Sequence, residues 1–109
     1  MKFSMKDGQK FGWKGIDGIG LTHDIKSGHV SFVKVSGKHG KIKTMHEDRF
    51  YFVISGKGKF WVGDEIYEVI KGDVVYVPKN MPYDFEGKMK MVMFFTPYFD
   101  PTKEVKLDD

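Results

Sequence analysis

Two apolar runs with glycines between them constrain the fold of this chain more than any other part of its sequence. Residues 50–54 form a continuous aromatic and β-branched run, and residues 59–62 form an alternating one. The four residues between them, 55–58, read Ser-Gly-Lys-Gly. An apolar run, a glycine turn and a second apolar run predict a β-hairpin. Residues 72–83 have a similar pattern, with an apolar run between a glycine and a proline-containing loop.

The composition favours an all-β fold in a single domain. Valine and isoleucine together number eighteen and phenylalanine ten, whereas alanine is absent and leucine occurs twice. β-Branched and aromatic residues suit a pleated, half-buried surface, and helical domains use alanine and leucine heavily. A chain of 109 residues is long enough for one hydrophobic core. Turn signals at short, regular spacing indicate a sandwich or a barrel.

We divide the single domain, residues 1–109, into three parts. Residues 1–28 are glycine-rich and are expected to form an N-terminal arm or strands. Residues 29–96 are expected to form the barrel core, and residues 97–109 a polar tail that is either a short helix or disordered. The strands expected from the apolar runs are residues 11–13, 19–25, 29–35, 41–45, 49–54, 59–62, 65–70, 74–77, 83–85 and 89–96.

The charge and the cysteine content exclude several classes of protein. The net charge is +3 and the seventeen lysines are scattered, so we expect no nucleic-acid partner. Cysteine is absent, which excludes disulfides and thiol chemistry and is compatible with a cytoplasmic location. The N-terminal residues lack an apolar signal core, and the longest apolar run, residues 91–95, is too short to span a membrane.

The two glycine-bounded stretches resemble the two sequence motifs of the cupin superfamily. The six-residue interval before Gly56 matches the end of the first motif, and the interval from Gly72 to Pro78 matches the start of the second. The resemblance covers roughly residues 37–95, and the chain is similar to small single-domain cupins of the mannose-6-phosphate isomerase-like group. This resemblance implies a cupin-type double-stranded β-helix, which is a jelly-roll-like barrel.

The resemblance also implies where a metal would bind. In most cupins, two histidines and a glutamate of the first motif and a histidine of the second bind one divalent metal ion. The residues at those positions here are Arg49, Tyr83 and, depending on the spacer length, either Ile42 and Thr44 or Lys43 and Met45. We therefore expect no metal and no other cofactor. The alternative is one divalent transition metal held by a shifted ligand set of His46 with Asp48 or Glu47.

Arg49 is the single arginine of the chain and is expected to face the barrel interior from its strand. A guanidinium is a rigid, permanently charged fork that suits a carboxylate or a phosphate. A buried charge needs a partner. That partner is either an anionic small molecule or an internal acid, for which Asp84, Glu47 and Asp48 are candidates.

Four more residues are expected to bind a ligand together with Arg49. Strand alternation places three of them on its face, and the fourth occupies a cupin ligand position; they are Thr44, His46, Tyr51 and Tyr83. Tyr83 either donates a hydrogen bond to a ligand, acts as a general acid, or is a buried phenol with a backbone partner. His46 either faces the interior or lies in a solvated turn before the strand.

The favoured function is a metal-free protein that binds an anionic or sugar-like small molecule inside the barrel. One alternative is a sugar isomerase, epimerase or lyase that uses His46 and Tyr83 as an acid–base pair, and another is the metal-dependent cupin described above. The remaining histidines are expected at the surface or in turns: His23, His29 and His39. The aromatic content of 16% exceeds what one small core readily hides, which predicts a homodimer.

Overall fold

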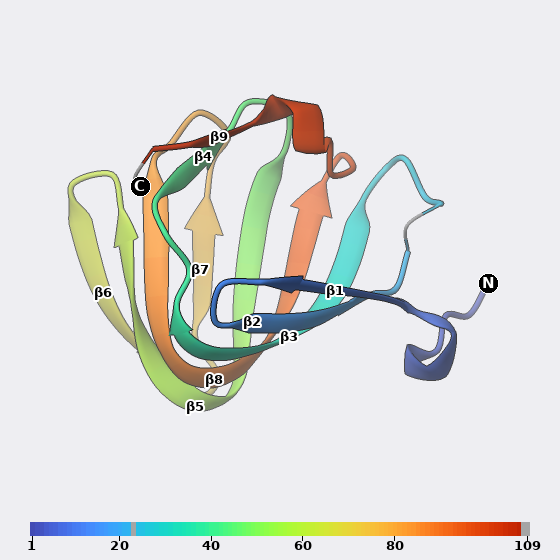
Figure 1. Ribbon diagram of the computed structural model, residues 1–109, viewed down its shortest axis with the longest axis horizontal. Helices are drawn as coiled ribbons and strands as arrows, with labels where there is room; N and C mark the ends of the chain where they lie inside the picture. The colour runs from blue at the N-terminus through green and yellow to red at the C-terminus, as the bar shows by residue number, and fades with distance from the viewer. Residues whose placement is uncertain (23, 108–109) are drawn as a thin grey trace.

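The computed structural model describes residues 1–22 and 24–107 (Figure 1). Within those ranges the chain forms nine β-strands and two short 3₁₀ helices, and no helix is long and apolar enough to cross a membrane. The 3₁₀ helices are η1 (Met5–Asp7) and η2 (Pro101–Lys103). The strands are β1 (Gln9–Trp13), β2 (Ile16–Gly20), β3 (His29–Lys38), β4 (Ile42–Thr44), β5 (Asp48–Val62), β6 (Glu65–Ile70), β7 (Val74–Val77), β8 (Tyr83–Thr96) and β9 (Glu104–Lys106). The predicted all-β class is confirmed.

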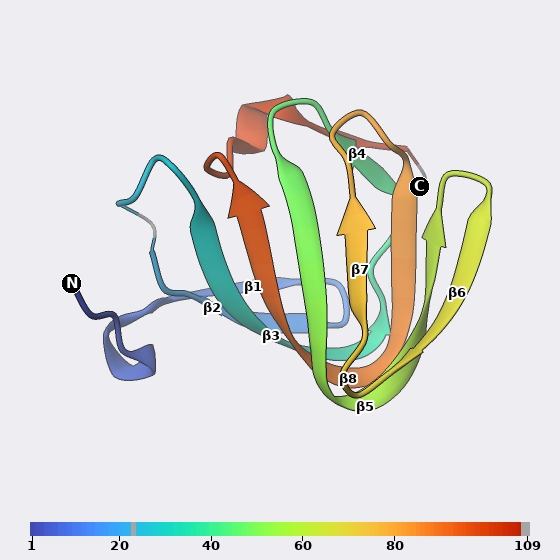
Figure 2. The ribbon, with the colours of Figure 1, turned by 180° about the vertical axis from the view of Figure 1, so that it is seen from behind.

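Strand β8 is the centre of the sheet. It pairs antiparallel with β3 along one edge and with β5 along the other. β1 and β2 extend the sheet beyond β3, and β5 also pairs with β6 and β7. The sheet curls into a barrel, with the β1–β2 hairpin on one side and β5 and β7 on the opposite side (Figures 1 and 2). The predicted barrel is therefore confirmed, and its upper rim in Figure 1 carries the β4–β9 pair.

Several predicted strands have the observed limits, and others do not. Residues 65–70 and 74–77 are strands β6 and β7, as predicted. The strand predicted at residues 19–25 is wrong beyond Gly20, where β2 ends, and residue 23 lies outside the described residues. The C-terminal tail carries a short strand, β9, that the polar sequence did not predict.

The hairpin predicted between residues 50–54 and 59–62 is wrong, because both runs belong to the single strand β5. The strands predicted at residues 83–85 and 89–96 are likewise one strand, β8. A turn would reverse the chain, whereas β5 stays paired with β8 on both sides of its glycines, with one register shift in between.

Three glycines let β5 and β8 bend together. Gly58 lies opposite Gly87, and Gly56 has φ +83°. A Cβ added at Gly87 would lie 2.5 Å from the carbonyl oxygen of Lys57, and one added at Gly58 would collide with the carbonyl oxygen of Glu86. Only residues without a Cβ permit the two backbones to approach this closely. The glycine signal therefore marks a bend shared by two strands, seen at the bottom of Figure 1.

The hydrophobic core lies between the inward faces of β3, β5 and β8. Val33, Met91 and Val53 lie side by side on these three strands and have no exposed surface. Phe60 and Phe85, which are paired on the other side of the bend, stack with ring centroids 4.9 Å apart. Burial of each such side chain contributes about 1.5–3 kcal/mol relative to exposure. This core fixes the strands that carry the polar residues of the interior.

The outward face of β7, β5 and β8 carries large apolar side chains. Phe52 on β5 lies opposite Val74 on β7, and both are exposed, by 44% and 59%. Tyr76 on β7 and Phe94 on β8 lie on either side of Phe50 of β5, and both are also exposed. We call these four residues the outer aromatic patch.

Candidate functional site

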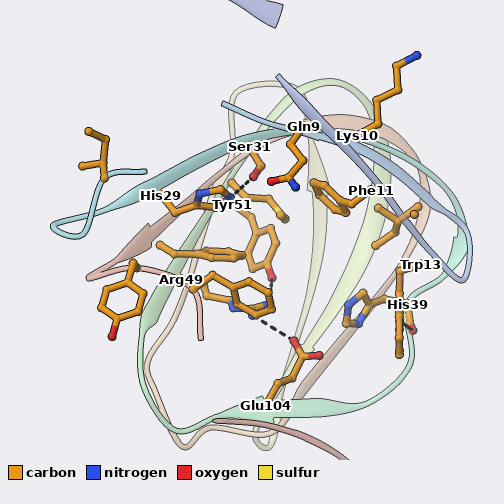
Figure 3. A pocket seen from close by; sticks show the side chains of 18 of the residues that line it. Gln9, Lys10, Phe11, Trp13, His29, Ser31, His39, Arg49, Tyr51 and Glu104 are labelled. Atoms are coloured by element: carbon orange, nitrogen blue, oxygen red, sulfur yellow. Dashed lines mark hydrogen bonds and ion pairs between the residues drawn. The ribbon is translucent and has the colours of Figure 1, made fainter. Parts of the chain in front are cut away.

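A cavity of about 710 Å³ lies inside the barrel, next to the β1–β2 hairpin. Strands β1, β3, β5 and β8 supply most of its wall, together with the segments 24–26 and 98–104. Arg49 and Glu104 lie together at what we call its deep or polar end, whereas the polar residues Gln9, Lys10, His29 and Ser31 lie toward the other end (Figure 3). Both ends of the chain therefore contribute to the same cavity.

Arg49 is the centre of the polar end. Its Nε donates to Oε2 of Glu47 at 2.9 Å, and its Nη2 contacts the same oxygen at 2.8 Å and Oε1 of Glu104 at 3.2 Å. Its Nη1 donates to the phenolic oxygens of Tyr83 at 2.7 Å and Tyr51 at 3.4 Å. A guanidinium donates through all three of its nitrogens, and each of them has an acceptor here. Of the two partners left open by the sequence, the structure shows the internal acid.

Aromatic rings enclose the Arg49 guanidinium. Its central carbon lies 4.0 Å from the ring centroid of Phe95 and 5.4 Å from that of Phe99. Such cation–π contacts stabilise a charge that is only 4% exposed. Burial acts to lower the pKa of Arg49, but the adjacent Tyr83 and Tyr51 outweigh it and raise that pKa. Arg49 is therefore a permanent cation in the barrel.

The two tyrosines form a hydrogen-bonded pair beside Arg49. The Tyr51 and Tyr83 hydroxyls are hydrogen-bonded to each other, and burial raises the pKa of both, so both phenols stay protonated near neutral pH. Because Arg49 donates to both oxygens, their mutual bond uses one phenolic proton and leaves the other for an outside acceptor. Tyr51 lines the cavity, whereas Tyr83 lies behind it. The arrangement favours Tyr51 as the donor to a bound molecule.

Two carboxylates complete the polar end. Glu47 has no exposed surface, its Oε1 has no hydrogen-bond partner, and Oγ1 of Thr44 donates to its backbone carbonyl at 3.0 Å. Burial raises the pKa of the Glu47 carboxyl, and the Arg49 guanidinium opposes this shift. Glu104 belongs to β9, which pairs with β4 at Thr44 and so places this carboxylate against Arg49 (Figure 3).

His39 faces the same cavity. It was expected at the surface or in a turn; it does lie in the connection between β3 and β4, but the surface expectation is wrong because it is only 8% exposed. Its Nδ1 lies 2.8 Å from the carbonyl oxygen of Gly40, which can only accept, so Nδ1 carries the proton and Nε2 is a free acceptor. Burial lowers the pKa of His39, which keeps the imidazole neutral. Asp84 holds this segment from β8 by accepting from the Gly40 N–H at 2.8 Å.

The rest of the cavity wall is largely aromatic. Phe11 and Trp13 lie on β1 and face the cavity, and Phe95 and Phe99 also line it. The Trp13 indole donates to the backbone carbonyl of His39 at 3.0 Å, which fixes the hairpin against the histidine. A lining rich in aromatic rings suits a flat, partly apolar group.

The structure brings together some of the residues predicted to bind a ligand. Arg49 and Tyr51 line the cavity and Tyr83 contacts both. Thr44 and His46 are not among the lining residues: Thr44 supports Glu47, and His46 packs edge-on against the ring of Tyr98 at 4.7 Å.

Three titratable residues that line the cavity were not predicted as site residues: Glu104, His39 and His29. Glu104 lies in the tail, and His39 lies between glycines that predicted only a turn. His29 was expected at the surface or in a turn, but it is half-buried on β3, where it contacts Ser31 at 2.7 Å, and it lines the cavity. His23 lies outside the described residues.

The residues at the cupin metal-binding positions do not fit a metal ion. A positively charged guanidinium with no free acceptor occupies one position, and a protonated phenol occupies another. Ile42 and Thr44, at two further positions, offer at most one hydroxyl, which already donates to a carbonyl. Within residues 1–22 and 24–107, no three histidine or carboxylate side chains lie close enough to hold a metal.

A family model described as "Cupin domain" matches residues 27–96. This match covers more than half of the chain, which therefore belongs to the cupin family. Among curated proteins, an uncharacterized protein of Streptomyces coelicolor is 35% identical over 54 residues, which are 47% of this chain and 51% of that protein. The chain thus spans about half the length of the curated relatives that it matches.

The solved structures similar to this chain include Pac13, described as a unique nucleoside dehydratase. The TM-score is 0.92 at 26% identity, over 99% of this chain and 91% of that one. A Streptomyces Pac13 variant with a tyrosine changed to phenylalanine, in complex with uridine, has a TM-score of 0.93 at 27% identity, over 99% of this chain and 90% of that one. A histidine-to-glutamine variant of Streptomyces Pac13, also in complex with uridine, is similar as well.

Proposed function

We propose that this cupin is a lyase that removes water from an uncharged nucleoside-like or sugar-like molecule held in the cavity, with His39 as the general base. The observation that carries the proposal is the free Nε2 of a buried, neutral imidazole in the cavity wall. A dehydration needs a base that accepts a proton from carbon and a donor that protonates the departing hydroxyl. His39, in the connection between β3 and β4, meets the first need, and Tyr51 on β5 meets the second.

The proposed dehydration moves one proton to His39 and one from Tyr51. Nε2 of His39 takes the C–H proton, and the electrons of that bond form a carbon–carbon double bond. The C–O bond of the neighbouring carbon breaks, and its oxygen leaves as water with the proton of Tyr51. Tyr83 and Arg49 stabilise the resulting phenolate, because Arg49 donates to both phenolic oxygens. The proton then returns from His39 through solvent.

The comparisons support the choice of substrate. The nucleoside dehydratase Pac13 is similar over 99% of this chain, and structures of it contain uridine. Variants of a tyrosine and of a histidine were solved with that nucleoside. This chain offers the same residue types, Tyr51, Tyr83 and His39, around one cavity.

The test has a binding stage and a reaction stage. Isothermal titration calorimetry with uridine is expected to give saturable binding that Trp13→Ala weakens. Mass spectrometry then follows loss of one water from a panel of nucleosides and their sugar-oxidised derivatives, in which a carbonyl acidifies the neighbouring C–H. His39→Gln is expected to abolish the reaction and keep binding. A reaction that survives His39→Gln would show that another group is the base.

Binding without catalysis is the second candidate function, and it is the one first favoured by the sequence. It predicts a saturable uridine or sugar complex and no mass change with any member of the panel. We also propose that the protein works without a metal, since Arg49 and Tyr83 occupy two ligand positions. Stoichiometric zinc, nickel, iron or manganese that survives dialysis against chelator would contradict this and support a site around His46.

The homodimer stays a proposal, supported by the outer aromatic patch. Its four side chains lie on one exposed sheet face, where a second copy would cover them. Light scattering at micromolar concentration is expected to give twice the mass of the chain. The double substitution Phe52→Lys and Phe94→Lys is expected to reduce the measured mass to that of a single chain. The cytoplasmic location and the mannose-6-phosphate isomerase-like subtype also stay predictions.

A further inference from the structure

We propose that Glu104 determines specificity by keeping anionic groups out of the deep end of the cavity, so that the protein accepts a nucleoside and rejects its phosphate ester. This inference rests on the proposed function for the nucleoside part of the ligand. The exclusion of anions rests on the charges around Arg49 alone.

The first step is the charge balance of the polar end. One cation, Arg49, faces two carboxylates, Glu47 and Glu104, and His39 is neutral. With both carboxylates ionised, as in their ion pairs with Arg49, the sum is one negative charge, and Oε1 of Glu47 is buried without a hydrogen-bond donor. A phosphate placed here would meet repulsion in a site of low dielectric, where a charge interaction is much stronger than in water.

The second step is the supply of hydrogen-bond donors. All three guanidinium nitrogens of Arg49 already contact acceptors within the protein. An incoming anion would compete with these partners for the guanidinium donors. Glu104 is the more displaceable carboxylate, because its side chain is 20% exposed and its contact is 3.2 Å, whereas Glu47 is fully buried and contacts two of the three nitrogens.

Two lysines also line the cavity, away from the deep end. Lys10 and Lys26 are exposed residues of the cavity lining, and so is Asp24. The Lys10 side chain points away from the cavity in Figure 3. These solvated charges leave the deep end unchanged, where Glu104 alone presents a partly exposed carboxylate among the described lining residues that contact Arg49.

The test is isothermal titration calorimetry of the full chain with uridine, uridine 5′-phosphate and inorganic phosphate. Glu104→Gln removes the charge and keeps the shape, and Glu104→Asp keeps the charge and changes the length. Glu86→Gln is the matched control, since Glu86 is an exposed acid outside the cavity lining. Circular dichroism establishes that each variant is folded.

Glu104→Gln is expected to tighten binding of both phosphates about tenfold, the scale of one charge at close range in a partly screened site. Uridine binding should change less than about threefold, and Glu104→Asp and Glu86→Gln should keep the wild-type preference. Equal phosphate affinities for wild type and Glu104→Gln would overturn the inference. Failure of wild type to bind uridine would contradict the proposed function, while a gain of inorganic phosphate binding in Glu104→Gln would still support the role of Glu104.

Discussion

Nη1 of Arg49 lies 2.7 Å from the phenolic oxygen of Tyr83, and the two residues are 34 positions apart in the sequence. The two residues belong to opposite ends of the β5–β8 ladder, with Arg49 opposite Phe95 and Tyr83 opposite Val62, so their side chains meet across the interior of the curled sheet. The positions are those at which the cupin resemblance implies metal ligands. Here they hold a cation and a hydrogen-bonding phenol, so the positive charge at these positions comes from an arginine side chain and not from a metal ion.

Tyr83→Phe is expected to destabilise the fold by about 1–3 kcal/mol, because Nη1 of Arg49 and the Tyr51 hydroxyl lose a buried partner. Urea denaturation measures this change. The control is Tyr67→Phe on β6, an exposed phenol, for which a change below about 0.5 kcal/mol is expected. Equal effects of the two substitutions would show that the buried hydroxyl pair adds nothing.

Arg49→Lys is expected to cost about 3–5 kcal/mol of stability although it keeps the charge, since an ammonium cannot satisfy Glu47, Glu104 and two phenols at once. Chemical denaturation is the measurement. Lys38→Met is the control, because Lys38 pairs with Asp84 but is 58% exposed, and a loss below about 1 kcal/mol is expected. If Arg49→Lys were as mild as this control, the buried network would not be a major source of stability.

The stability contributed by His39 is expected to depend on pH in a defined direction. Burial lowers its folded pKa, while the unfolded chain titrates near 6.5. Between these values the unfolded state binds more protons, so stability is complete above about pH 6.5 and is lost as the pH falls below it. His39→Gln should therefore lose less stability than wild type as the pH falls below about 6.5.

Glu47 acts in the opposite direction, since its pKa is raised and its protonated form is favoured by folding. Comparing His39→Gln with wild type at each pH keeps this contribution constant. NMR titration of the imidazole gives an independent check. A His39 pKa at or above 6.5 in the folded protein would contradict both the burial argument and the assignment of a neutral base.

Gly58→Ala is expected to destabilise the fold by about 1–3 kcal/mol, because its Cβ would collide with the Glu86 carbonyl across the β5–β8 ladder. Thermal and urea unfolding measure the change. Gly12→Ala is the matched control: Gly12 is also a strand glycine, and an added Cβ there would meet nothing closer than 3.8 Å. Similar midpoints for the two variants would show that β5 and β8 can move apart at the bend without cost.

The sequence predicted well what depends on local pattern. The limits of β6 and β7 follow from apolar runs closed by glycine or proline, and the inward position of Arg49 follows from strand alternation. Gly56 and Gly58 show where such reasoning stops. A glycine that turns a chain and a glycine that lets another backbone approach give the same local signal, and the partner here is Gly87 on a distant strand.

The missing members of the site have the same origin. His39 is buried because Trp13 and Asp84, 26 and 45 positions away, hold its segment against the barrel. Glu104 reaches Arg49 because β9 pairs with β4. Neither relationship leaves a periodic signal near the residue itself, so the sequence assigned one to a turn and the other to a polar tail.

The central position of β8 has a consequence for how the chain folds. Its partners lie on either side of it in space but both precede it in sequence, with His29 opposite Phe95 and Asp48 opposite Thr96. Neither β3 nor β5 can complete its main ladder until this late segment arrives and large loops close. Chains dominated by such distant pairings fold on the millisecond-to-second scale, so β3 and β5 spend that interval with unpaired edges that are open to association with other chains.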